Sequence, residues 1–277
     1  MTAKEKIESN DQTDNDSCIL EEGDIYFFYR PKKNSTEVKD IDDVRRFFMV
    51  TSVNKQYDRT SYKIKKTQKQ FYRLFVIGKK SLPEVRQSEA RSSERYWARV
   101  GGIFDKLDNI TNELFADEFR KGDGARPVGA GKYIIARHQS HAELAYVLIT
   151  PQEPGDAQDE LGIEKEASFI ISVINPKNPA PEGFPSSEEP PKYPEKVLEE
   201  FNKKENFVSL ESDTHLIDYQ NSQVILIGAR EGKNVIKSDL GIDIDEEIRQ
   251  KESDIIRKLK LENQNVPIKP LMEGKLE

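Results

Sequence analysis

Apolar residues along this chain gather in short runs that are separated by polar segments. Seven of the runs are rich in β-branched and aromatic residues and have the length of strands. Most of them follow one another too closely for helical crossovers, which favours antiparallel pairing. The strands predicted in this way are residues 25–29, 45–53, 71–78, 132–137, 142–150, 167–174 and 223–228.

A second pattern predicts helices. Apolar residues recur at spacings of three and four in residues 104–119 and 243–261, as in amphipathic helices. Shorter helices are expected where a proline precedes or a glycine follows a polar run, over residues 84–96, 156–161 and 195–202. These elements together predict an α+β fold, with a mainly antiparallel sheet or a small barrel of about seven strands and flanking helices.

Charge and repetition divide the chain into regions. Residues 1–18 have no apolar periodicity, which predicts a disordered acidic tail. We expect residues 19–235 to form a globular body and residues 236–277 to form a charged helix and a tail. Within the body, Gly23-Asp24-IYFFYR resembles Gly131-Lys132-YIIARH, and each is followed by two further strands and a proline-rich exit. This likeness suggests an internal duplication, with halves at 19–120 and 121–235.

Composition excludes several classes of protein. Cys18 is the lone cysteine, so no internal disulfide and no zinc site with several thiolates can form. No apolar run reaches the length of a membrane span, and the N-terminus has no apolar signal segment. We therefore expect a soluble cytoplasmic protein with no membrane partner.

Basic residues are concentrated in one segment of an otherwise acidic chain. The net charge is -7, yet residues 59–99 contain 12 Lys and Arg and only 3 Glu. Such a patch could bind nucleic acid, or it could be a solvated loop that offsets acidic neighbours. The candidate nucleic-acid residues are Lys63, Lys65, Lys66, Lys69 and Arg73.

Two histidines flank the turn of the hairpin predicted in residues 131–151. His138 and His141 are the first and last residues of a four-residue turn, so they could converge on one divalent metal ion. Glu143 or His215 would supply a third ligand. The alternative is that both histidines are ordinary polar turn residues, in which case no cofactor is present.

A third candidate is an anion pocket formed by Arg95, Trp97, Arg126 and Arg137, although these residues suit surface salt bridges equally well. Residues 122–131 are glycine-rich but lead into a strand, the wrong order for a nucleotide-binding loop. No motif of a catalytic nucleophile is present.

Several blocks resemble a conserved prokaryotic family of uncharacterised function: EEGDIYFFYR, RFFMV, YRLFVIGKKSLPE, GKYIIARH and EASFIISVINP. That resemblance covers about residues 19–230 and implies no activity. The run from Gly23 to Tyr29 also resembles a strand of PUA-like and EVE domains, which implies a small barrel that holds modified bases or RNA.

Two functional hypotheses follow. In the first, the protein is a non-enzymatic binding or interaction module, with a possible nucleic-acid surface and with the helix over 243–261 contacting a protein partner. In the second, it is a metal-assisted hydrolase that uses His138 and His141.

Overall fold

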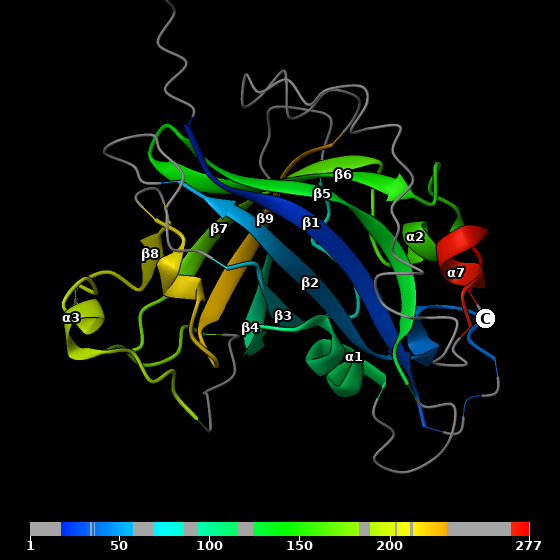
Figure 1. The fold of residues 1–277 in the computed structure, drawn as a ribbon, viewed down its shortest axis with the longest axis horizontal. Helices are drawn as coiled ribbons and strands as arrows, with labels where there is room; N and C mark the ends of the chain where they lie inside the picture. Colours follow the sequence, from blue (N-terminus) through cyan, green and yellow to red (C-terminus); the bar gives the residue numbers. More distant parts are fainter. Residues whose placement is uncertain are drawn as a thin grey trace, which may run out of the picture.

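Nine antiparallel strands form one sheet in the computed structural model of this chain (Figure 1). The structure describes residues 18–33, 35, 37–57, 69–85, 94–115, 124–182, 189–202, 204–210, 213–231 and 267–276. The strands are β1 (Cys18–Pro31), β2 (Val44–Gln56), β3 (Phe71–Ile77), β4 (Arg95–Phe104), β5 (Arg126–His138), β6 (His141–Thr150), β7 (Glu166–Ile174), β8 (Phe207–Ser209) and β9 (Gln223–Glu231).

The sheet closes on itself as a barrel. Its strand order is β6-β5-β1-β2-β3-β4-β9-β7-β8, and β6 also pairs with β7, so eight strands form a ring and β8 extends it beside β7. Closure leaves the ring strands with a neighbour on both sides, which satisfies their backbone groups. The prediction of an α+β fold with about seven strands and flanking helices is therefore wrong, because the chain is mostly antiparallel β-barrel.

Helices contribute little to the described part of the chain. They are α1 (Leu107–Phe115), α2 (Asp156–Glu160), α3 (Glu195–Leu198) and α7 (Lys269–Met272), with two single-turn helices η1 (Ile41–Asp43) and η2 (His215–Ile217). Helix α1 covers part of the outer face of the barrel, where Ile110 and Leu114 pack against outward residues of β1 to β3. Helix α7 adds the buried Leu271 to the same apolar cluster.

The barrel interior is filled by apolar side chains. Alternate residues of each strand point inward, and Ile25, Phe27 and Tyr29 of β1 are fully buried in the main core cluster. The rings of Phe27 and Phe47 stack with centroids 6.2 Å apart, and Tyr146 meets Phe27 edge to face. Polar side chains occupy one end of the interior.

Two strands escaped the sequence prediction. In β4 the run RYWARVGGIF contains two adjacent glycines, and its ends fall in the helices predicted over 84–96 and 104–119. It pairs with β3 on one side and β9 on the other, so it is essential to closure. The other missed strand, β8, has three residues, too few for any periodic signal.

The ring consists of two four-stranded meanders. One is β1-β2-β3-β4 and the other is β5-β6-β7-β9, and the contacts between them are β1 with β5 and β4 with β9. In the first contact Asp24 faces Lys132, while Gly23 faces Tyr133 and Ile25 faces Gly131. A two-fold rotation through the Asp24 and Lys132 pair thus exchanges the two strands and preserves their register.

The same two-fold rotation relates the register shifts of the two meanders. The β1–β2 pairing shifts between Glu22 and Gly23, and the β5–β6 pairing shifts between Ala130 and Gly131. Likewise the β3–β4 and β7–β9 pairings shift at corresponding steps, Leu74/Phe75 and Ser168/Phe169. The sequence likeness between the halves aligns Gly23-Asp24 with Gly131-Lys132, and these are the residues that the rotation exchanges.

The predicted terminal regions lie largely outside the described residues. This holds for residues 1–17 of the acidic tail, whose last residue, Cys18, begins β1, and for the helix predicted over 243–261. The described C-terminal segment, 267–276, returns to the barrel, where Gly274 accepts a hydrogen bond from Ala157 of α2 (Figure 1). No helix in the described ranges is long and apolar enough to span a membrane.

Candidate metal centre

The β5–β6 hairpin brings two histidines and a glutamate to one face of the sheet. Gln139 and Ser140 form the two-residue turn, and Gln139 adopts a φ of 54°, which a tight hairpin of this length requires. His138 pairs directly with His141 across the strands. Glu143 follows His141 by two residues, so it shares its face, which points away from the apolar interior.

The three side chains are close enough to share one ion. Nδ1 of His138 lies 3.2 Å from Oε1 of Glu143, and Nε2 of His141 lies 2.9 Å from the same oxygen. All three potential ligand atoms lie within 4.8 Å of one another. The side chains of His138, His141 and Glu143 are 17%, 13% and 4% exposed, so the group is held in the sheet surface and is still open to solvent.

Electrostatics keep the carboxylate available as a ligand. Burial alone would raise the pKa of Glu143, but polar contacts with His141, Ser168 and His138 oppose this, and the net pKa is below the ordinary value. Glu143 is therefore ionised at neutral pH and offers a negative oxygen between two imidazoles.

The donor set fits a divalent transition metal. Zinc binds histidine nitrogen and carboxylate oxygen at about 2.0–2.1 Å, which puts neighbouring ligands of a tetrahedral site about 3.3 Å apart. The two spacings to Oε1 of Glu143, 3.2 and 2.9 Å, are close to that value, while the two imidazole nitrogens lie within 4.8 Å of each other. The remaining histidine, His215, does not join the group, because its Nε2 contacts Glu200 and its Nδ1 faces Asp213. Of the two candidate third ligands, the structure thus brings Glu143 to the pair.

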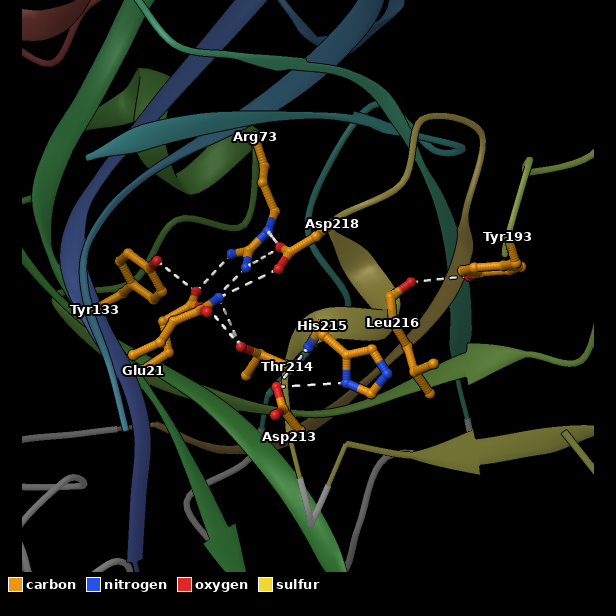
Figure 2. Close-up of polar contacts among 10 residues, drawn as sticks. Glu21, Arg73, Tyr133, Tyr193, Asp213, Thr214, His215, Leu216 and Asp218 are labelled. Carbon is orange, nitrogen blue, oxygen red and sulfur yellow. Dashed lines mark hydrogen bonds and ion pairs between the residues drawn. The ribbon is translucent and has the colours of Figure 1, made fainter. Parts of the chain in front are cut away.

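A second polar cluster lies inside the barrel (Figure 2). The guanidinium of Arg73, on β3, is fully buried and donates to both carboxylate oxygens of Glu21, on β1, at 2.6 and 2.7 Å. It also donates from Nε to Asp218 at 2.7 Å. Tyr133, Gln56 and Thr214 complete the hydrogen bonding of Glu21, at 2.7, 2.8 and 2.8 Å.

The pKa values of the two carboxylates in this interior cluster shift in opposite directions. Burial would raise the pKa of Glu21, but the Arg73 charge and the surrounding donors bring it below its ordinary value. For Asp218, burial and the nearby Glu21 charge together outweigh Arg73, so its pKa is raised. The sequence analysis missed Glu21, Tyr133 and Asp218, although a charged residue at an inward position of an apolar strand is a usable signal.

The structure changes the interpretation of the basic patch. Lys63, Lys65 and Lys66 lie outside the described residues, and Lys69 is exposed. Arg73, by contrast, is inside the barrel and bound to two carboxylates, so it is not part of a nucleic-acid surface. The error arose because the residue follows a lysine-rich run in sequence but occupies an inward position of β3.

The predicted anion pocket does not form as a unit. Arg126 and Arg137 lie at opposite ends of β5, about 35 Å apart at the rise of an extended strand. Arg95 is an exposed residue at the start of β4. Trp97 covers the backbone of Gly78, where an added Cβ would come within 2.1 Å of the indole, so its role is packing.

Comparison with known proteins adds no assignment. No protein-family model, curated protein or solved structure matches the chain. The resemblance to an uncharacterised prokaryotic family and to PUA-like domains therefore stays a prediction.

Proposed function

We propose that this protein binds a divalent transition metal ion at His138, His141 and Glu143, and that this centre is its working site. The observation that carries the proposal is the convergence of the two imidazoles on one oxygen of an ionised carboxylate. Two histidines and one glutamate also form the protein ligands of several catalytic zinc sites.

The number of ligands determines what the ion can do. Among the described residues the group comprises three potential ligands, and structural zinc sites normally have four. A three-ligand centre leaves a position for water or substrate, and a bound ion would polarise a carbonyl or phosphoryl group and acidify that water. Hydrolysis is thus the reaction class that the donor set supports.

Titration calorimetry tests the binding step. After chelator treatment and dialysis, we expect the protein to take up one Zn²⁺ or Co²⁺ per chain, with d–d absorption in the Co²⁺ form. His138→Ala and Glu143→Gln should each lose stoichiometric binding, while His215→Ala, which alters the third histidine of the chain, should bind as the wild type does. Equal binding by His138→Ala and the wild type would refute the proposed centre.

Hydrolysis is tested separately on the metal-loaded protein. We expect cleavage of p-nitrophenyl acetate or bis(p-nitrophenyl) phosphate above background, and we expect His141→Ala to abolish it. A protein that binds the metal stoichiometrically and cleaves neither ester nor phosphodiester would contradict the hydrolase assignment and leave metal binding as the function.

A further inference from the structure

A pocket of about 320 Å³ opens beside the interior cluster, at a site that shares no residue with the metal ligands. Asp218 connects the two regions, because its carboxylate contacts Arg73 inside the barrel and its side chain is 25% exposed at the pocket. Glu189, Lys192 and Tyr219 also line the pocket. The volume falls in the lower range of small-molecule sites, which occur often at the mouths of barrels.

The charge balance of the interior cluster leaves Asp218 incompletely neutralised. One guanidinium faces two carboxylates, and both terminal nitrogens of Arg73 donate to Glu21 in a forked ion pair, although Nη2 also donates to Asp218. Glu21 also receives hydrogen bonds from Tyr133, Gln56 and Thr214, so it is the better stabilised anion. Asp218 shares Arg73 with Glu21, receiving hydrogen bonds from its Nε and Nη2 at 2.7 and 2.5 Å, and Gln56 adds a longer contact of 3.4 Å. A cation at the pocket would supply the missing positive charge.

The pocket wall favours an organic cation over a bare ion. Tyr219 adjoins Asp218 in the sequence and lines the same pocket, and its ring is held edge to face against Tyr193 with centroids 4.8 Å apart. In turn Tyr193 is fixed by hydrogen bonds to Leu216 and Ser222, both 2.8 Å. An aromatic ring beside a carboxylate binds ammonium and guanidinium groups through cation–π attraction together with charge-assisted hydrogen bonds.

We infer that this pocket binds a small molecule with a protonated amine or guanidinium group, which donates to Asp218 and lies against Tyr219. The exposed Lys192 is the single cationic side chain among the residues that line the pocket, and it limits the affinity by repulsion. The inference does not depend on the metal proposal, because none of the metal ligands contacts this pocket.

Calorimetry with agmatine, which has an amine and a guanidinium group, tests the inference on the full-length protein, with 1,4-butanediol as the neutral control. We expect saturable binding of agmatine and none of the diol. Asp218→Asn should weaken agmatine binding about tenfold or more, as expected for a lost hydrogen bond to a charged group. His138→Ala should leave it unchanged, so failure of the metal proposal and failure of this one are distinguishable.

Two further pairs of variants keep the test decisive if Asp218→Asn does not fold. Lys192→Ala should bind agmatine more tightly, while Lys196→Ala, which removes an exposed lysine outside the pocket lining, should not change the affinity. Tyr219→Phe should retain binding and Tyr219→Leu should weaken it severalfold. No saturable binding of agmatine by the wild type, or equal affinities of wild type and Lys192→Ala, would overturn the inference.

Discussion

Arg73 lies inside the barrel with its guanidinium hydrogen-bonded to two carboxylates. A buried ion pair of this kind contributes little net stability compared with apolar packing, because both partners lose their hydration. Removal of one partner has a much larger effect, since the other charge then stays buried without compensation. The interior cluster therefore specifies how the strands that contribute Glu21 and Arg73 fit together at this end of the barrel.

Arg73→Met tests this account of the interior cluster. The variant leaves Glu21 and Asp218 without their cation, and we expect the free energy of unfolding at pH 7 to fall by about 3–5 kcal/mol. Urea unfolding followed by circular dichroism measures it. Lys69→Met, an exposed change on the same segment, should shift the stability by less than about 0.5 kcal/mol. Equal losses in the two variants would contradict the assigned role of Arg73.

His215 provides a prediction about pH. Its hydrogen bond with Asp213 raises its pKa, burial lowers it, and the charges of Asp213 and Glu200 raise it further, so the net pKa is above the ordinary value. A histidine with a raised folded-state pKa stabilises the fold fully below its unfolded pKa and loses that contribution as the pH rises through the folded pKa.

His215→Gln should therefore be less stable than the wild type in acid, and the difference should shrink as the pH rises. Thermal unfolding of both proteins at about pH 5.5 and about pH 8.5 measures the difference on either side of the titration. A difference that is the same at both pH values would show that the ion pair does not contribute.

Single residues of the candidate site were predictable where the signal is local. His138 and His141 flank a two-residue turn, which brings them together across the hairpin. Side chains alternate between the two faces of a strand, so Glu143, two residues after His141, lies on the same face as the histidines. The interior cluster joins Glu21, Arg73 and Asp218, which are far apart in the chain. Their meeting depends on strand order, which one sequence does not contain.

At the scale of elements, two glycines allow the closest approach of neighbouring strands. A Cβ on Gly23 would come within 1.9 Å of the Ser52 carbonyl oxygen, and one on Gly131 within 2.0 Å of the Val147 carbonyl oxygen. Both lie where the strand register shifts, at positions related by the two-fold rotation. The backbone contact at these points is possible because glycine has no side chain.

We expect Gly23→Ala and Gly131→Ala to destabilise the protein by similar amounts, about 1–3 kcal/mol each. Chemical unfolding measures both. Gly101→Ala is the matched control, because its Cβ would first meet the Val76 side chain at 3.1 Å, which can move, and its cost should be smaller. A Gly101→Ala variant as unstable as the other two would show that the backbone contacts are not decisive.

Strand positions were more predictable than strand partners. The apolar runs marked seven strands because inward and outward positions both carry apolar or aromatic residues in β1, β2 and β6. Strand β4 was missed because Gly101 and Gly102 interrupt its pattern and its ends fall in segments that were predicted as helices. The number of strands was wrong because β4 and the three-residue β8 were both missed.

At the scale of the whole molecule, closure of the sheet changes the fold class. It depends on the β1–β5 and β4–β9 pairings, each between residues that are distant in the sequence, and on the β6–β7 pairing. Local periodicity does not reveal such pairings, so the sequence alone did not distinguish an open sheet from a barrel. The sequence likeness suggested two related halves, and the matched register shifts show that the two meanders are arranged about a two-fold axis.

The two proposed sites are asymmetric features of this pseudo-symmetric barrel. The rotation that exchanges Asp24 with Lys132 takes Glu21 to Gly129, so the interior cluster has no counterpart in the other half. Equally, the hairpin of His138 and His141 corresponds to the connection between β1 and β2, residues 32–43, which has no histidine. Each of the two proposed sites therefore rests on residues that have no equivalent in the other half of the barrel.

The central claim, a metal centre at the hairpin, is tested most directly by elemental analysis of the purified, untagged protein after growth with transition metals supplied and no chelator. We expect a transition metal, zinc or manganese, at one ion per chain in the wild type, and its loss in His138→Ala and Glu143→Gln. A wild-type protein that contains no transition metal and takes up none on titration would contradict it.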